Sequence, residues 1–329
     1  MTETLAALRG DPDYLALAPR LSNADAATRR IALIELADHG DPDHLPALLA
    51  ALDDPAVAVR AEAARLVAGW DEADAAATLA ERLAAHLLDP APEVRDAAAQ
   101  SLSELKAPQA GPALLPWARH PDAFARAAAL RALRELRVPQ AGDAALDALD
   151  HTDATVRREA VGVLGWLKLA TAVPALARLA QTDPDAEVRR IASGALGFAD
   201  GAAILPALLA ALADPQWAVR EEAAATLGKL RLRPATPALI DSLCGDIWQV
   251  RIKAARALGL IGDATAVPAL IASLGHAAGN LRKEAAIALG EIGDATADPA
   301  LRLAESDPDP EVRKAARLGL AGLRREGQP

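Results

Sequence analysis

The sequence predicts an all-α protein in which about ten two-helix repeats stack into a solenoid. Three observations support this prediction: an internal period close to 31 residues, one apolar stripe in every repeat, and a helix-favouring composition. Hydrophobic residues make up 52% of the 329-residue chain and aromatic residues only 2%. Such a composition suits closely packed helices and leaves few of the residues that favour a sheet.

The period is set by an arginine, here called the anchor, that usually follows valine. Successive anchors are 31 residues apart, except for one spacing of 35 and one of 32. A period of this length is typical of helical repeat proteins. The anchors are Arg29, Arg60, Arg95, Arg126, Arg157, Arg189, Arg220, Arg251, Arg282 and Arg313.

The residues around each anchor predict one helix of the repeat, which we call helix B. The third residue after every anchor is alanine, and the seventh is leucine in all repeats except the second, which has Val67. Together with the residue before the anchor, these positions lie on one stripe of an α-helix and predict a buried seam. Asp-Pro pairs such as Asp214-Pro215 precede several anchors. Aspartate is expected to cap helix B and proline to open it.

A second helix, helix A, follows each helix B. Its signature is a proline seventeen residues after the anchor, as at Pro206, Pro237 and Pro268. Glycines at the end of helix B, such as Gly228 and Gly290, are expected to let neighbouring backbones approach. Because neither helix can bury its apolar face alone, the repeats must shield one another along a single solenoid over residues 1–329.

The segments DPDPEVRKAARLGL (307–320) and GDATAVPALIASL (262–274) resemble the HEAT-like repeats first associated with phycobilisome lyases. The resemblance extends from about residue 12 to residue 324. It implies a right-handed superhelix with the B helices on the concave side. It also implies a ladder of Asp-Arg contacts between consecutive repeats, in which the anchors take part.

Chemistry-bearing motifs are few, so no catalytic, cofactor-binding or metal-ligating residue is predicted. HEAT-like relatives that hold a di-iron centre use repeated His-Glu pairs, and this sequence has no His-Glu dipeptide. His120, His151 and His276 replace the aspartate before the anchor, which favours a local loop role over metal binding. We find no nucleophile motif and no glycine-rich phosphate loop. Catalysis therefore has little support.

Charge and composition also restrict the partners and the compartment. The formal charge of −10 opposes binding to nucleic acid. Cys244 is the only cysteine, and neither an export signal nor a membrane segment is recognisable. We therefore expect a cytoplasmic protein that binds neither nucleic acid nor membrane. A monomer is the favoured oligomeric state.

The positions of helix B that lie outside the buried seam, counted from the anchor, predict where a partner binds. In repeats five to nine they carry aromatic and apolar residues with both signs of charge, a pattern that suits a protein or peptide. The predicted partner-binding residues are Trp166, Arg190, Ile191, Phe198, Trp217, Trp248, Ile252, Lys253, Arg256, Leu260 and Ile287.

Trp217 and Trp248 stand three residues before their anchors in consecutive repeats and are expected to be neighbours. They could pack locally as staples between repeats, or they could anchor a partner, since tryptophan is enriched at interface hot spots. We predict a non-enzymatic scaffold or adaptor that binds a protein or peptide on its concave surface. The alternative is a lyase-type accessory subunit for bilin attachment or removal, which the resemblance alone suggests. A purely structural or engineered solenoid without a partner is a third possibility.

Overall fold

The computed structural model describes residues 8, 10–245 and 247–326, with side chains as far as residue 323. Residues 1–7, part of the segment in which no export signal is recognisable, lie outside the described residues. The described residues form twenty α-helices and no β-strand, as the sequence predicts. None of these helices is both long enough and apolar enough to span a lipid bilayer.

The helices form consecutive pairs, and every anchor arginine lies on the even-numbered member, so the even-numbered helices are the predicted B helices. The α-helices are α1 (Pro12–Leu21), α2 (Ala26–Asp38), α3 (Leu45–Ala51), α4 (Val57–Leu66), α5 (Ala76–Ala85), α6 (Pro92–Glu104), α7 (Gly111–Leu114), α8 (Ala123–Glu135), α9 (Gly142–Ala148), α10 (Ala154–Leu167), α11 (Val173–Thr182), α12 (Ala186–Ala195), α13 (Gly201–Leu212), α14 (Trp217–Lys229), α15 (Thr236–Leu243), α16 (Trp248–Ile261), α17 (Val267–Ser273), α18 (Gly279–Ile292), α19 (Asp298–Ala304) and α20 (Pro310–Glu326).

Short 3-10 helices lead into most of the odd-numbered helices or follow other elements. They are η2 (Pro42–His44), η3 (Val67–Trp70), η4 (His86–Leu88), η5 (Pro108–Ala110), η6 (Pro116–Arg119), η7 (Pro139–Ala141), η8 (Ala170–Ala172), η9 (Leu196–Phe198), η10 (Arg233–Ala235), η11 (Ala264–Ala266) and η12 (Ala295–Ala297).

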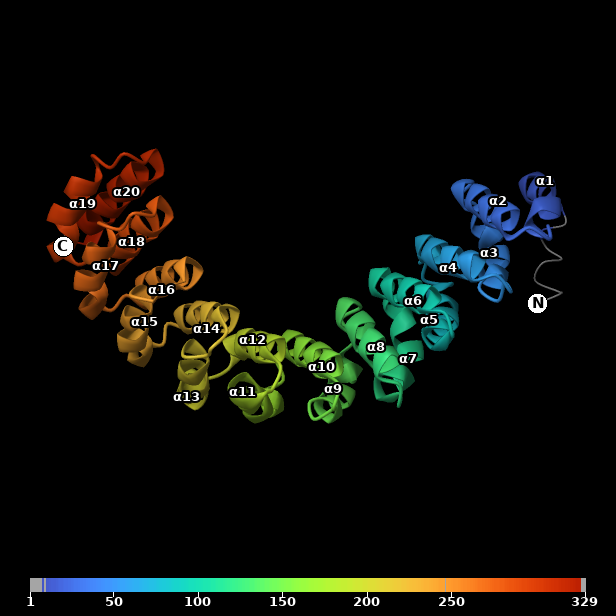
Figure 1. The fold of residues 1–329 in the computed structure, drawn as a ribbon, viewed down its shortest axis with the longest axis horizontal. Coiled ribbons are helices and arrows are strands. Elements are labelled where there is room, and N and C mark those ends of the chain that lie inside the picture. Colours follow the sequence, from blue (N-terminus) through green and yellow to red (C-terminus); the bar gives the residue numbers. More distant parts are fainter. Residues whose placement is uncertain (1–7, 9, 246, 327–329) are drawn as a thin grey trace. The chain divides into compact units, whose positions relative to one another are not determined.

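The chain separates into two compact units, Met1–Leu167 and Lys168–Pro329. Within each unit the even-numbered helices form one layer and the odd-numbered helices the other (Figure 1). Each even-numbered helix packs against the next even-numbered helix of the same unit. The single solenoid over residues 1–329 stays a prediction, because the chain divides into two compact units.

The predicted seam is the core of both units. All ten alanines at the third position after the anchor are 0% exposed, from Ala32 in α2 to Ala316 in α20. Val67, which replaces leucine in the second repeat, is also fully buried. Small alanines at the centre of the seam let helices A and B pack closely, and the larger leucines fill the space around them.

Glycines near the ends of the B helices bring neighbouring backbones together in the second unit. A Cβ at Gly228 would lie 2.6 Å from the Cα of Ala257, and a Cβ at Gly290 would lie 2.5 Å from the Cα of Gly319. Real side chains are not accommodated at such distances without movement of the neighbouring helix. The expected close approach of the B helices is therefore confirmed at these positions.

The predicted helix starts need a correction. The Asp-Pro pairs lie before helix B and do not cap or open it: α14 begins at Trp217, two residues after Pro215, and α12 begins at Ala186. Asp214 instead accepts a hydrogen bond from the backbone N–H of Gln216 at 2.8 Å, in a tight turn that precedes the helix. The same carboxylate also binds Arg189 of the preceding repeat.

Candidate functional site

The anchor arginines connect consecutive repeats, and we call each of these connections a rung. Arg189 donates from Nε and Nη2 to the two carboxylate oxygens of Asp214, at 2.6 and 3.0 Å. Its Nη1 donates to the backbone oxygen of Asp183, at the start of its own repeat, at 2.8 Å. The same two-pronged contact joins Arg29 to Asp54, Arg60 to Asp89, and Arg282 to Asp307. These contacts are the ladder that the family resemblance implies.

The rungs shift the pKa values of their aspartates. The hydrogen bond from Arg60 is the largest cause for Asp89, and it lowers the pKa of this carboxyl despite the opposing effect of burial. Arg282 lowers the pKa of Asp307 in the same way. Both side chains of the Arg282–Asp307 pair are nearly buried, with exposures of 12% and 9%. The rungs are therefore partly desolvated ion pairs that stabilise the joints between repeats.

Three rungs have histidine in place of aspartate. His120, His151 and His276 each accept a backbone N–H from the second residue after them through Nδ1, at 3.0 Å. They thus keep the turn that aspartate makes elsewhere, which agrees with the predicted loop role. Without a carboxylate, however, the ladder is incomplete: the buried Nε of Arg126 has no hydrogen-bond partner among the described residues.

Another rung lacks a side chain altogether. Arg220 donates from Nη1 to the backbone oxygens of Asp214 and Pro215, at 2.7 and 3.0 Å, as the other anchors do. The residue 25 positions further on is Gly245, where Arg189 has Asp214. Within the described part of the chain no carboxylate binds the Nε and Nη2 of Arg220. Among the described residues, the ladder that the resemblance implies is therefore interrupted at this joint.

The predicted partner-binding residues lie on or beside the even-numbered helices. Trp166 belongs to the first unit and is 41% exposed. The other ten belong to the second unit, and we call them the candidate surface: Arg190, Ile191, Phe198, Trp217, Trp248, Ile252, Lys253, Arg256, Leu260 and Ile287. None of these residues is buried.

The two tryptophans of the candidate surface occupy equivalent places. Trp217 is the first residue of α14 and Trp248 the first residue of α16, and these two helices pack against each other. Their side chains are 40% and 57% exposed. A tryptophan that served only as a packing staple would be largely covered by its neighbours. A large apolar area is therefore available to a partner at both positions.

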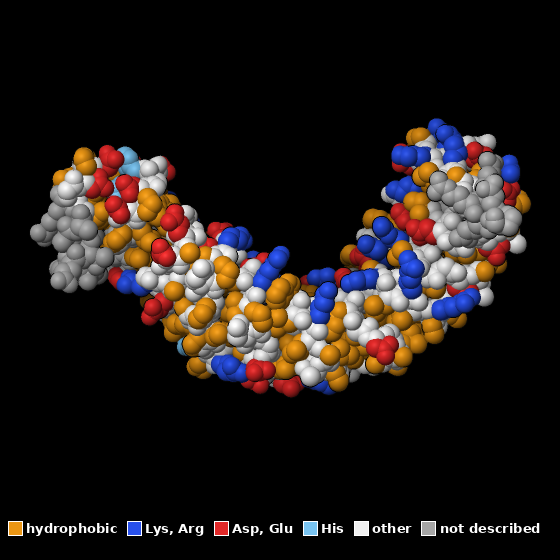
Figure 2. All heavy atoms as spheres, turned by 180° about the vertical axis from the view of Figure 1, so that it is seen from behind, with side chains coloured by type: hydrophobic (Ala, Val, Ile, Leu, Met, Phe, Trp, Pro, Cys, Tyr) orange, Lys and Arg blue, Asp and Glu red, His pale blue; other side chains and the backbone are white. Residues whose placement is uncertain are grey.

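Most cations of the candidate surface have carboxylate neighbours. Arg190 binds Glu187 at 2.6 Å on its own helix, α12, and Glu222 at 3.4 Å on the next B helix, α14. Lys253 lies 3.9 Å from Glu221. The hydrogen bond to Glu187 is the main reason that the pKa of Arg190 is raised. Figure 2 likewise shows acidic, basic and hydrophobic side chains interspersed on the face that it presents.

One aromatic position on the B helices was missed by the sequence prediction. Phe124, in α8, is 38% exposed, and the guanidinium of Arg95 lies 5.7 Å from its ring centre. It lines a cavity of about 230 Å³ in the first unit together with Arg131 and Arg158. Phe124 stands two residues before its anchor, which is one of the offsets used for the prediction. Phe124 was not among the predicted residues because the predicted site covered only repeats five to nine.

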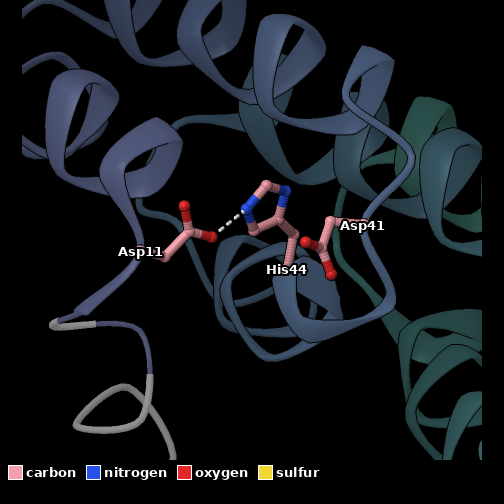
Figure 3. A group of neighbouring side chains, drawn as sticks. All are labelled: Asp11, Asp41 and His44. Carbon is pink, nitrogen blue, oxygen red and sulfur yellow. Dashed lines mark hydrogen bonds and ion pairs between the residues drawn. The ribbon is translucent and has the colours of Figure 1, made fainter.

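A second feature beyond the sequence prediction is a group of Asp11, Asp41 and His44 in the first unit. One potential ligand atom from each lies within 4.8 Å of the others. Figure 3 shows the Asp11 carboxylate directed at the imidazole of His44, at 2.5 Å from Nε2. Nδ1 lies 3.3 Å from the backbone oxygen of Leu36, so both ring nitrogens have partners. The buried histidine thereby fastens the start of α1 to η2.

Comparison with known proteins supports the fold. A family model of HEAT repeats matches residues 14–87, 58–134, 111–197, 180–247 and 245–321. No curated protein matches the sequence. The matched model describes HEAT repeats in general, so the lyase-type role stays a prediction from the sequence resemblance.

Several solved structures are similar to this chain in fold. Yeast importin-beta (Kap95p) has a TM-score of 0.66 and 16% identity, and the match covers 98% of this chain and 53% of that one. An engineered protein has a TM-score of 0.54 and 23% identity, with 95% and 99% covered. YibA of Escherichia coli has a TM-score of 0.52 and 20% identity, with 92% and 99% covered. Since the family model matches nearly the whole described chain, this protein belongs to the HEAT-repeat family.

Proposed function

We propose that this protein is a non-enzymatic scaffold or adaptor that binds a protein or peptide on the B-helix side of its repeats. The candidate surface of the second unit is the centre of this site. Trp166, which belongs to the first unit, is a separate predicted binding residue in repeat five. The observation that carries the proposal is the exposure of Trp217 and Trp248 at equivalent positions of two packed helices. Exposed tryptophans next to balanced charges are typical of protein interfaces.

The charge pattern favours a protein partner over a polyanion. A nucleic-acid site needs cations that are free to displace counterions from phosphates. On the candidate surface Arg190 and Lys253 already face carboxylates, at 2.6 and 3.9 Å. Yeast importin-beta, with a similar fold, binds RanGDP. This supports a protein as the class of partner and says nothing about its identity.

Alanine substitution of the tryptophans tests the proposal. Partners are first captured from the host cell with the purified chain, and the dissociation constant of each captured protein is then measured. We expect Trp217→Ala and Trp248→Ala each to weaken binding by about 30-fold, the effect of a hot spot of about 2 kcal/mol. The far-UV circular dichroism of both variants should be unchanged.

Leu303→Ala is a matched control, because Leu303 is 78% exposed but lies on α19, an odd-numbered helix. It should leave the dissociation constant unchanged. Equal affinities for the wild type and the two tryptophan variants, with helicity intact, would place the binding site elsewhere and refute the proposal.

A further inference from the structure

The interrupted rung at Arg220 coincides with a cavity in the second unit. The cavity has a volume of about 390 Å³. Leu209 and Leu212 of α13, together with Ile247 and Val250, give it apolar walls. Arg220 and Asp241 contribute its charged groups. No described side chain therefore fills the space that the rung side chain fills in other joints, and Arg220 lines this space.

The geometry of the neighbouring joint shows what the free edge of Arg220 would bind. In Arg189 the Nε and Nη2 groups form a fork that holds both oxygens of Asp214, at 2.6 and 3.0 Å. Arg220 is held by its Nη1 in the same way as Arg189, at 2.7 Å from a backbone oxygen. Its fork, however, has no carboxylate among the described residues. A planar guanidinium with one edge available binds a carboxylate with both prongs.

We propose that this cavity accepts the side-chain carboxylate of an acidic residue, flanked by apolar residues, from the bound protein or peptide. The carboxylate binds the Arg220 fork and completes the rung, and an apolar neighbour packs against Leu209, Leu212 and Val250. The inference rests on the proposed function, since it assigns the chemistry of one contact made by the same partner.

One observation favours an aspartate side chain over other carboxylates, and a second places the cavity near the candidate surface. The rungs described above that are complete each hold the carboxylate of an aspartate, as in Asp54, Asp89 and Asp307. The cavity is also adjacent to the candidate surface in the sequence, because its lining residue Ile247 directly precedes Trp248. A peptide that contacts Trp248 can therefore place a neighbouring side chain at Arg220. The carboxylate of Asp241, which also lines the cavity, can accept a backbone N–H of such a peptide.

Fluorescence anisotropy with short labelled peptides tests the inference on the full chain. The probe is fluorescein-Leu-Asp-Leu-amide, and the control probe has asparagine in place of aspartate. We expect saturable binding of the aspartyl probe and at least tenfold weaker binding of the asparaginyl probe. Arg220→Lys, which keeps the charge but loses the fork, should also weaken the aspartyl probe at least tenfold.

Gly245→Asp is the sharpest variant, because it supplies the missing rung from the chain itself. A Cβ at Gly245 would meet only the backbone oxygen of Ser242, at an ordinary 3.4 Å. We expect this variant to raise Tm by about 2–4 °C and to weaken the aspartyl probe at least tenfold. Gly245→Ala supplies no carboxylate to the Arg220 fork, so this variant should bind the aspartyl probe as the wild type does. Unchanged affinity in Gly245→Asp and Arg220→Lys would overturn the inference.

Two further measurements identify the source of the carboxylate. Asp246 follows Gly245 and lies outside the described residues, so the affinity of Asp246→Asn for the aspartyl probe is also measured. We expect it to equal that of the wild type. Probe binding that appears only in Asp246→Asn would mean that the chain supplies its own carboxylate. Tighter binding of fluorescein-Leu-Leu with a free C-terminus than of the aspartyl probe would likewise contradict the side-chain assignment.

The outcome is separable from that of the proposed function. If the probes fail while Trp217→Ala and Trp248→Ala still weaken the captured partner, only the cavity assignment is wrong. If the probes bind Arg220 while those two variants leave the partner's affinity unchanged, the cavity assignment holds and the proposed surface is wrong.

Discussion

At the scale of the residue, the strength of each joint depends on the side chain that stands before the anchor of the next repeat. An aspartate accepts three hydrogen bonds at once, as Asp214 does from the Arg189 fork and the N–H of Gln216. A histidine in the same place can accept only one. His276 accepts the N–H of Ala278 through Nδ1, so in the neutral ring Nε2 carries the proton. That N–H then faces Arg251 Nη1 at 2.6 Å, and two donors oppose each other.

Replacing this histidine with aspartate should repair the joint. We expect His276→Asp to raise the free energy of unfolding by about 1 kcal/mol, because the new carboxylate accepts from Arg251 and keeps the turn. Urea unfolding followed by circular dichroism measures the change. His276→Asn keeps the turn without the charge and should gain less. A His276→Asp protein no more stable than His276→Asn would show that the ladder contributes nothing at this joint.

Some residue contacts could not be predicted from the periodic pattern because they break it. His44 and Asp11 are 33 residues apart, and neither stands at an anchor or a rung position. The sequence alone shows that Gly245 stands where other joints have the rung aspartate. The consequence, a cavity, depends on how α13, α15 and α16 pack around the missing side chain. The spacing of Trp217 and Trp248 in the sequence suggested that they form part of a binding surface. Their exposure could be established only from the packed helices α14 and α16.

At the scale of the element, the glycines of the B helices have different functions that the sequence alone does not separate. Gly290 faces the backbone of α20, with its hypothetical Cβ 2.5 Å from the Cα of Gly319. Gly194 in α12 faces only the end of the Glu222 side chain, at 2.7 Å, which can rotate away. The first glycine permits a close helix contact, and the second only lowers the helix propensity of α12.

A matched pair of alanine variants distinguishes these two functions. Gly290→Ala should lower the free energy of unfolding by about 1–3 kcal/mol, since α18 and α20 must move apart. Gly194→Ala should be neutral or stabilising by up to about 1 kcal/mol, because helix propensity improves and the neighbouring side chain yields. Thermal unfolding of both variants provides the measurement. Equal effects would indicate that backbone contact between the B helices does not limit the packing.

The helices themselves were largely predictable, because the stripe of alanine and leucine recurs at the same offsets in every repeat, with Val67 in place of leucine in the second. The exact start of each helix B was not, since an Asp-Pro pair resembles a cap. What distinguishes Asp214 from a cap is its second partner, Arg189, which lies 25 residues away. A local sequence signal cannot show that a carboxylate is shared between two repeats.

At the scale of the whole molecule, rungs in both units make folding sensitive to acid. Asp89 and Asp307 have folded-state pKa values below the ordinary value, chiefly because Arg60 and Arg282 donate hydrogen bonds to them. A carboxyl with a lowered folded-state pKa adds stability above its unfolded pKa of about 3.9. That stability is lost as the pH falls through the lower folded-state pKa.

We therefore expect the free energy of unfolding to change little from these groups between pH 7 and pH 5 and to fall below about pH 4. Urea titrations at a series of pH values measure this dependence. Arg282→Gln removes one rung, so it should be less stable than the wild type at pH 7 and lose less stability between pH 7 and pH 3. An unchanged pH dependence in this variant would show that the Asp307 rung does not contribute to it.

The ladder also has a consequence for how a protein of this kind can change its length. Each rung joins only neighbouring repeats, and most rungs span the same 25 residues. Deleting or duplicating one 31-residue segment between two aspartate rungs would reconnect an anchor to a chemically equivalent carboxylate. Joints such as Gly245 and His276 are not interchangeable in this way. These joints distinguish individual repeats from the others. Loss of the repeat that carries Arg220 would therefore remove the cavity, while the seam residues of the remaining repeats could still pack against one another.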